Sequence, residues 1–406
     1  MEDTYADIKK HCEENNRLIR AVLDDFLIPY AAAKEKLVPL MERQIKKYNR
    51  TTQDWPASYL NYLKSEYIAH RIFSRSGFIT RYLNHSEVKN LPQQQYQFLE
   101  FYTKHPWRYS FAEILEKKED AFFEMEDVMT GERYLLYSPG MQSTEAEQHP
   151  RLWFTLVAYN GKCWQTFGLI IPLKAFTVDD IFFFATEINP QIEDEDMLME
   201  EAERNPFPFF MLLSASNMPV VASRGYETVQ CYSTDVIEDL DVVGLSGLFT
   251  KAWSKDIYRL TLNKYGEFPH HAIAYYNERK KELLRTAMTM KGFEELTLAL
   301  AKAGHSLNLE AEIAVSSVMI LIAEKILNKR IELNPYENLF KLRVDKEKSQ
   351  NLEQINRFLQ LVLPYYNTGK EIDVKKLATQ AGIDEGEALS IWEHLKKNIG
   401  SGRKDK

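Results

Sequence analysis

The sequence predicts a multidomain α+β protein with an N-terminal helical bundle, a central antiparallel β-rich region and a C-terminal helical region that contains a helix-turn-helix-like unit. The prediction rests on hydrophobic spacing, which is helical before residue 105, alternating between 107 and 173, and helical again after 293. The expected domains are a helical bundle (1–105), an antiparallel β meander or partly open barrel (106–175), a second α+β part (176–290), a helical layer (291–345) and a trihelical module with a basic tail (346–406).

The first region has the spacing of an α-helical bundle, for which a structural role is favoured over holding a cofactor. In the first helix, apolar residues fall near one face, namely Ile8, Cys12, Leu18, Ile19, Val22, Leu23 and Phe26. Pro29 is expected to end or bend this helix, because proline has no amide donor. Asp54 and Pro56 mark the start of a later helix as its cap and first turn.

The central region is expected to contain five strands joined by short turns. Thr130-Gly131 and Asn160-Gly161 supply tight turns, and Asn-Gly between two β-rich runs is a strong hairpin signal. Sequential strands with short connections favour a small meander or a partly closed barrel. The expected strands are 108–116, 121–129, 133–137, 152–159 and 163–171.

The segments Phe98–Phe101, Tyr109–Glu116 and Phe123–Tyr134 are similar to a β segment of long bacterial proteins, many of which end in a SecA-type (SEC-C) zinc knuckle. The resemblance covers about residues 98–173, and its most specific piece is the turn Asp127-Val-Met-Thr-Gly-Glu132. It implies a small β unit. The cysteine and histidine cluster of the knuckle is absent from this sequence, so the resemblance implies no zinc site.

After Pro172 the sequence predicts a helix over 178–188, capped by Thr177, and a solvated acidic helix over 193–203. Periodicity leaves Leu283–Met290 open between strand and helix, and it predicts one central helix over Leu309–Leu327. The candidate strands of the second β part are Met218–Ser223, Thr228–Ser233, Lys255–Leu262 and Ala272–Asn277.

Composition limits the possible settings. A net charge of −8 argues against a dominant nucleic-acid surface. The odd number of cysteines, Cys12, Cys163 and Cys231, indicates a reducing compartment, so we expect a cytoplasmic protein. The N-terminus lacks the basic and apolar regions of a signal peptide, and the longest apolar run, Ile313–Ala323, is too short to span a bilayer. We expect no membrane association.

The C-terminal module is expected to contain three helices, Leu352–Leu363, Val374–Gln380 and Glu385–Asn398. It resembles a helix-turn-helix, with apolar Leu377 and Ala378 before a turn at Gly382. The start of its last helix is acidic, where a DNA reader needs basic or amide side chains. A protein-facing or structural unit is therefore favoured over DNA reading, although the tail is basic. The possible interaction surface comprises Asp384, Glu385, Glu387, Lys396 and Lys397.

Local catalytic signatures are incomplete, so no catalytic residue, cofactor or metal is predicted. Gly244–Gly247 resembles a nucleophile elbow, but Leu248 stands where the closing glycine belongs. His270 and His271 would point to opposite faces of a strand and could not share one ion. His305 follows a helix end, where it would complement the helix dipole.

These observations favour a cytoplasmic binding or interaction protein whose terminal unit contacts a protein partner. One alternative is an enzyme whose site is assembled from distant residues in the cleft between the two β-rich parts. The other is a DNA-binding regulator that uses the C-terminal module.

Overall fold

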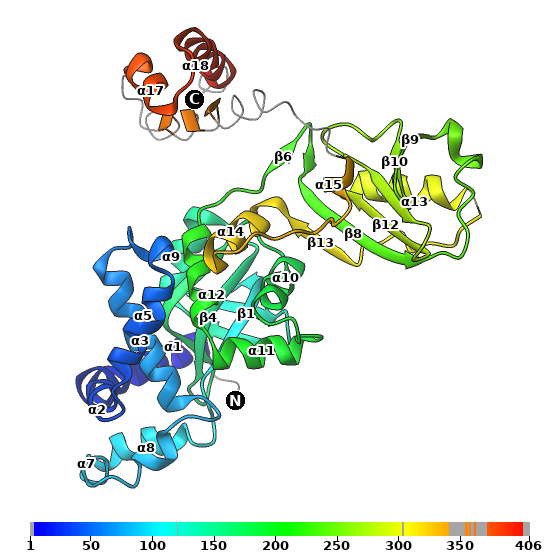
Figure 1. Cartoon of the computed structure of the whole chain (residues 1–406). Helices are drawn as coiled ribbons and strands as arrows, with labels where there is room; N and C mark the ends of the chain where they lie inside the picture. Colours follow the sequence, from blue (N-terminus) through cyan, green and yellow to red (C-terminus); the bar gives the residue numbers. More distant parts are fainter. Residues whose placement is uncertain are drawn as a thin grey trace. The chain divides into compact units, whose positions relative to one another are not determined.

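The computed structural model divides into two compact units, Met1–Leu333 and Asn334–Lys406. The first contains helices and both large sheets, and the second is helical (Figure 1). The predicted α+β multidomain class is confirmed. The residues that the structure describes are 4–119, 121–302, 304–340, 354–355, 357–358, 361–362 and 372–400.

The chain begins with helices, as the spacing predicts. Thr4 caps the first helix by accepting a hydrogen bond from the Asp7 amide. Pro29 was expected to end or bend the first helix. The π-helical segment η1 ends at Leu27, the backbone stays helical, and Pro29 lies in the first turn of α2, where a missing donor costs little. The helical elements are α1 (Tyr5–Leu18), η1 (Ile19–Leu27), α2 (Ile28–Lys34), α3 (Leu37–Lys47), α4 (Asn49–Thr52), α5 (Ala57–Phe73), α6 (Ile79–Tyr82), α7 (Ser86–Lys89) and α8 (Gln93–Phe101).

The next five strands form a closed barrel in the order β1-β2-β3-β5-β4, rather than a meander or a partly open barrel. Closure is possible because the first half of β1 pairs with β4 and its second half with β2, while β3 and β5 pair in parallel. A five-stranded barrel of this order, with a helix between β3 and β4, has the architecture of the oligonucleotide/oligosaccharide-binding (OB) fold. The elements are β1 (Arg108–Lys117), β2 (Phe122–Asp127), β3 (Arg133–Tyr137), α9 (Pro139–Gln148), β4 (Leu152–Tyr159) and β5 (Trp164–Leu173).

Side-chain alternation gives the barrel wall two different faces. The interior is packed with apolar side chains, among them Ala112, Met125, Leu136 and Trp153. Outward-facing Tyr109, Phe111 and Phe154 instead join a core shared with the N-terminal helices and with a second group of helices. That group is α10 (Val178–Ile188), α11 (Glu195–Arg204), α12 (Phe207–Phe210) and the 3₁₀ turn η2 (Met211–Ala215).

A buried carboxylic acid anchors α5 to the barrel. Glu66 is 1% exposed and accepts a hydrogen bond of 2.7 Å from the Leu169 amide. Gly168 and Leu169 form a bulge, because β4 pairs Leu156 with Phe167 and Thr155 with Ile170. Gly168 has φ +81°, and a Cβ there would lie 2.5 Å from the Glu66 carboxylate, so this contact requires glycine.

A second, antiparallel sheet follows, in the order β13-β8-β12-β11-β10-β9. Leu283–Met290 proves to be strand β12 followed by the Thr289 cap of helix α13. The single helix expected over Leu309–Leu327 is wrong in its first part: residues 313–316 pair with β8, and Ser316 caps the helix that follows. The elements are β6 (Ala222–Ser223), β7 (Tyr226–Glu227), β8 (Val229–Val236), η3 (Gly244–Gly247), β9 (Phe249–Ser254), β10 (Ile257–Leu262), β11 (Ile273–Asn277), β12 (Glu282–Ala287), α13 (Met290–Ala301), β13 (Ile313–Ser316) and α14 (Ser317–Leu327).

The second unit contains α15 (Glu337–Phe340), α17 (Val374–Ala381) and α18 (Glu385–Gly400). Helices α17 and α18 match the last two helices of the predicted module, and Gly382 makes the turn between them with φ +73°. Half of the module's expected first helix, Leu352–Leu363, lies outside the described residues, and the described half (354–355, 357–358 and 361–362) is helical. The unit has its own apolar core, which includes Phe358, Val362, Leu377, Ala378, Ala381, Ile383 and Ala388.

Glu66→Gln is expected to make the stability of the protein less dependent on pH. Burial raises the pKa of Glu66 well above the ordinary value of 4.5, so the folded state holds a proton that the unfolded chain releases. The carboxyl group thus contributes stability that is fully present below its unfolded pKa and is lost as the pH rises toward its folded pKa. Glutamine does not ionise, so we expect urea denaturation to favour the variant increasingly from pH 4.5 toward neutrality. The exposed Glu113→Gln is the control, and a pH-independent difference at Glu66 would contradict the assignment.

Candidate functional site

The C-terminal interaction surface predicted from the sequence contains residues with different roles. The Asp384 carboxylate accepts hydrogen bonds from the amides of Gly386 and Glu387 at 2.9 and 3.2 Å, so it caps α18. Glu385 forms an exposed ion pair with Lys375 at 3.2 Å. Lys396 and Lys397 belong to α18, but their side chains lie outside the described set. Of the predicted surface, the structure therefore places Glu385 and Glu387 together in the first turn of a helix.

An apolar side chain lies close to these carboxylates in the sequence of α18. Leu389 is 44% exposed, whereas the neighbouring Ala388 is buried in the core of the unit. A helix-turn-helix protein would place this end of its second helix in the major groove. There the acidic first turn would meet phosphates and be repelled, so acidic and apolar chemistry together fits a protein surface better.

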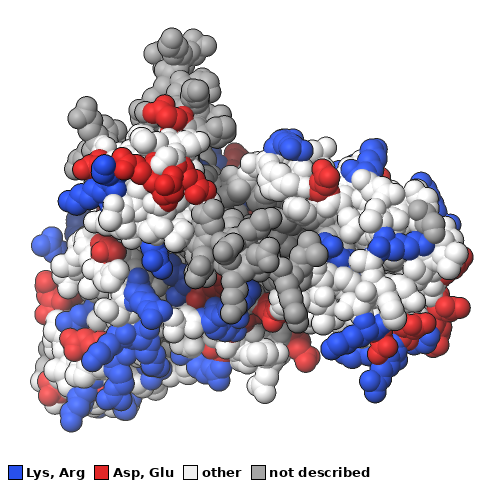
Figure 2. Space-filling model, turned by 45° about the horizontal axis from the view of Figure 1, so that its top comes forward, with Lys and Arg blue, Asp and Glu red and all other residues white. Residues whose placement is uncertain are grey.

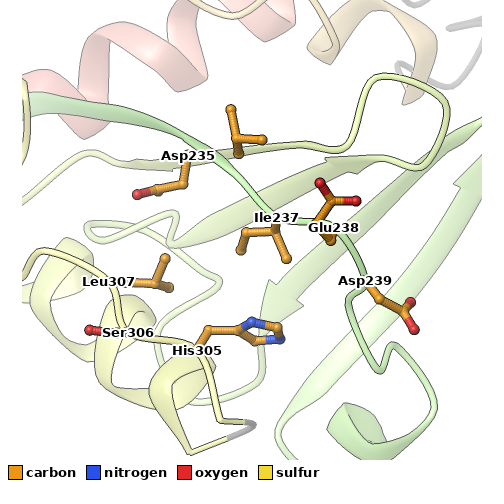
Figure 3. Close-up of a pocket in the computed structure, with 8 residues that line it drawn as sticks. Asp235, Ile237, Glu238, Asp239, His305, Ser306 and Leu307 are labelled. Atoms are coloured by element: carbon orange, nitrogen blue, oxygen red, sulfur yellow. The ribbon is translucent and has the colours of Figure 1, made fainter.

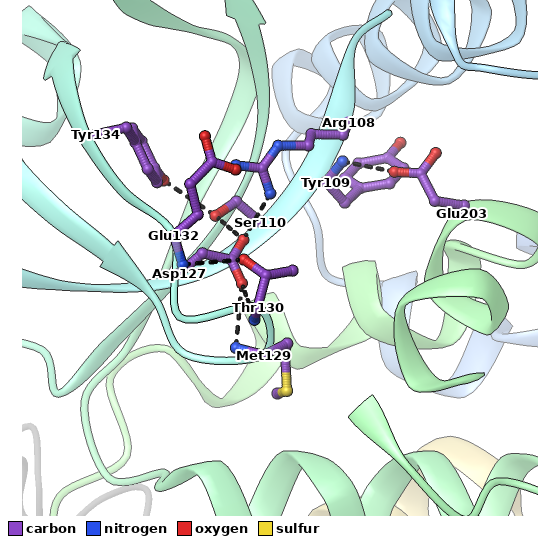
Figure 4. A network of polar contacts seen from close by, with 9 residues as sticks. All are labelled: Arg108, Tyr109, Ser110, Asp127, Met129, Thr130, Glu132, Tyr134 and Glu203. Carbon is purple, nitrogen blue, oxygen red and sulfur yellow. Dashed lines mark hydrogen bonds and ion pairs between the residues drawn. The ribbon is translucent and has the colours of Figure 1, made fainter. Parts of the chain in front are cut away.

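A polar network centred on Asp127 lies at one end of the barrel interior (Figure 4). Asp127 is fully buried and accepts hydrogen bonds from Ser110 at 2.7 Å, from Arg108 at 3.0 Å, and from the amides of Met129 and Thr130 at 3.1 Å each. The predicted Thr130-Gly131 turn is thereby fixed by the side chain of the last residue of β2.

Arg108 closes this end of the barrel. It also pairs with Glu132 at 2.7 Å, and its guanidinium lies 4.9 Å from the Trp164 ring centroid and 5.7 Å from that of Tyr134. Its charge is matched by two carboxylates and its flat faces are covered by rings. Arg108 and its partners therefore fill this end of the barrel, and the charge of Arg108 is already paired and does not offer a binding site for an anionic ligand.

The outer face of β2 and β3 is where OB barrels hold oligonucleotides. In this protein Phe122, Leu135 and Tyr137 of that face pack against Tyr5 and Ile8 of α1. On the remaining part, Glu113 lies opposite Glu126 and Glu116 opposite Glu124 across β1 and β2. Lys118 and Arg133 pair with three of these four carboxylates, so the carboxylates stay in excess. An occupied and acidic face does not suit a phosphate backbone.

Two cysteines that are 151 residues apart meet beneath α1. The Sγ atoms of Cys12 and Cys163 are 3.3 Å apart. The side-chain amide nitrogen of Asn160, Nδ2, donates a hydrogen bond to Cys12 Sγ at 3.3 Å. The hydrogen bonds from Cys163 and Asn160 lower the pKa of Cys12, while the bond to Cys12 and burial raise that of Cys163. The sequence predicts the Asn160-Gly161 hairpin that holds Cys163, but nothing near Cys163 in the sequence indicates that Cys12 is its partner.

A pocket of about 480 Å³ lies at the end of β8 (Figure 3). Glu238, Asp239 and His305 line it beside Asp235, whose carboxylate pairs at 2.9 Å with the fully buried Arg285. The lining comes from the end of β8 and the segment after α13, so this pocket belongs to the second sheet alone and not to a cleft between the two β-rich parts. Within the described residues, no group of three potential metal ligands converges.

The two adjacent histidines are held in different ways. His270 ends a turn, and its Nδ1 is hydrogen-bonded at 2.7 Å to Oγ1 of Thr289, the N-cap of α13. His271 comes directly after this turn with φ +41°, and both side chains are partly exposed. His270 therefore supports the start of a helix.

Asp127→Ala is expected to destabilise the protein by about 3 kcal/mol, because it leaves Ser110 and two turn amides without their acceptor and Arg108 with one fewer carboxylate. Glu132→Ala, which removes the exposed partner of the same arginine, is expected to cost less than about 1 kcal/mol. Urea denaturation of the two variants measures the difference. Equal losses would show that Asp127 does not organise the network.

Oxidation is expected to join Cys12 to Cys163. With hydrogen peroxide as the oxidant, the two thiols lose two hydrogen atoms and form one S–S bond, while the peroxide is reduced to water. Intact-mass spectrometry without reductant should show this loss in the wild type and not in Cys163→Ser. The crosslink should stabilise the fold by up to about 4 kcal/mol through loop closure. If both thiols remain free after the folded protein is treated with peroxide, the two sulfur atoms are not close together.

No protein-family model matches the chain, and a search of curated proteins gave no significant match. The resemblance of residues 98–173 to proteins with a SEC-C knuckle therefore stays a prediction. Within the part of the chain that the structure describes, no helix is both long and apolar enough to cross a bilayer.

Proposed function

We propose that this chain is a cytoplasmic binding protein whose C-terminal unit contacts a protein partner. The observation that carries the proposal is the first turn of α18, where Glu385 and Glu387 precede the exposed Leu389. Apolar contact supplies binding free energy, and the carboxylates select a partner with basic side chains. The partner surface is accordingly an apolar pocket or groove with a basic rim.

The packing of the second unit supports this role. Its apolar core is separate from those of the first unit, and it contains Ile383 and Ala388 on either side of the acidic turn. Residues fixed in this way hold the start of α18 in one conformation. A preorganised helix end loses less conformational entropy on binding than a flexible segment would.

The charge pattern weighs against a DNA-binding regulator. In a helix-turn-helix protein this acidic turn would take the position of the base-reading side chains. The OB-type face of the barrel is partly covered by α1 and carries more carboxylates than cations. Little retention on duplex DNA is therefore expected near physiological salt. Salt-sensitive binding to duplex DNA that becomes tighter in Glu385→Gln would favour a DNA-binding regulator instead, because removing a carboxylate relieves repulsion from phosphate.

The partner experiment compares the full chain with the double variant Glu385→Lys/Glu387→Lys in crosslinked pull-downs from native extract. We expect the main crosslinked protein to be reduced at least about tenfold with the variant, because attraction to basic side chains becomes repulsion. Glu13→Lys/Glu14→Lys, in exposed positions of α1, makes the same change of net charge elsewhere. An unchanged set of partners with the α18 variant would remove the C-terminal unit from the function.

A further inference from the structure

A basic pocket of about 290 Å³ lies between α3, α4 and α14 in the first unit. Its cationic lining residues come from distant parts of the chain: Lys46, Lys47 and Arg50 from the N-terminal helices, and Lys325 from α14. Figure 2 shows Lys and Arg side chains gathered over the N-terminal helices, at the lower left of the view. A protein with a net charge of −8 thus concentrates positive charge in one hollow.

The pocket lining contains four cationic side chains and no carboxylate. All four are exposed, and among the described residues Lys46, Lys47 and Lys325 have no ion-pair partner. The nearby Lys329, by contrast, is paired with Glu187 at 2.6 Å. Like charges gathered in a hollow repel one another, and an anion bound among them would relieve that repulsion.

The pocket wall holds one of the four cationic groups in place. Arg50 donates a hydrogen bond to the side chain of Asn328, which ends α14 with φ +50° in the left-handed region. That contact uses one of the five N–H donors of Arg50. Thr51 and Thr52 are buried beside it and fix α4. Of the remaining lining residues, Tyr48 and Asn49 add polar atoms and Ile326 is apolar.

We propose that this pocket binds a small molecule that carries a diphosphate group. Two linked phosphates present several negative charges and many acceptor oxygens, which match three ammonium groups and one guanidinium. A single carboxylate would leave most of the positive charge unmatched. A nucleic-acid strand needs cations along a groove, whereas these four converge on one hollow.

The proposal is tested by isothermal titration calorimetry of the full chain with sodium pyrophosphate, beside sodium sulfate at equal ionic strength. We expect pyrophosphate to bind at least about tenfold more tightly than sulfate, and Lys46→Gln or Lys325→Gln to weaken its binding at least about tenfold. Arg43→Gln is the matched control, because it removes the same charge from an exposed position of α3 outside the pocket lining. It should change the affinity by less than about twofold.

Three results would overturn the proposal. The first is the absence of pyrophosphate binding. The second is equal weakening by Arg43→Gln, which would reduce the site to general surface charge. The third concerns the source of the phosphates: if a fluorescent single-stranded oligonucleotide binds in a way that requires Lys46 and Lys325, and pyrophosphate does not displace it, the pocket would be assigned to nucleic acid. Because the site lies in the first unit, none of these results depends on the partner of α18.

Discussion

The first unit depends on a single strand that pairs with two neighbours in succession. Residues 108–112 of β1 pair with β4, residues 112–117 pair with β2, and a register shift at Ile114–Glu116 separates the second pairing into two parts. This sharing closes the barrel and fixes which side chains face in. A slip of one residue would turn Tyr109 inward and Ser110 outward, so the helical core outside and the Asp127 network inside depend on the same register.

Buried carboxylates repeatedly serve as connectors in this unit. The Glu66 side chain accepts a hydrogen bond from the Leu169 amide in β5, and the Asp127 side chain accepts one from the turn after β2. The Asp180 side chain in α10 accepts a hydrogen bond of 2.7 Å from the Ser316 amide. In each case an acidic side chain satisfies backbone donors that a strand or turn would otherwise leave unpaired. These groups join helices to strands and strands to turns. These buried groups therefore hold the fold together, and groups on the surface are the better candidates for binding a partner or ligand.

Two surfaces with opposite chemistry follow from that division. The start of α18 combines carboxylates with an exposed leucine, and the hollow beside α4 combines four cations with polar side chains. One surface suits a protein and the other suits a small polyanion, so they need not compete for one ligand. The barrel itself acts as a scaffold: its interior is filled, its end is plugged by Arg108, and part of its outer wall is covered by α1.

Local sequence determined the elements whose signals lie within a few residues: the five barrel strands, the Asn160-Gly161 hairpin, the Thr177 cap and the Gly382 turn. Helix α9 was missed, although Ser138 before Pro139 is a cap signal. Only the tertiary structure decided barrel closure, the parallel pairing of β3 with β5, the meeting of Cys12 with Cys163, and the approach of Lys325 to Lys46. Hydrophobic periodicity and turn residues report on neighbours along the chain. These contacts instead depend on how whole elements pack, and no residue pattern near either partner indicates which distant residue it will meet.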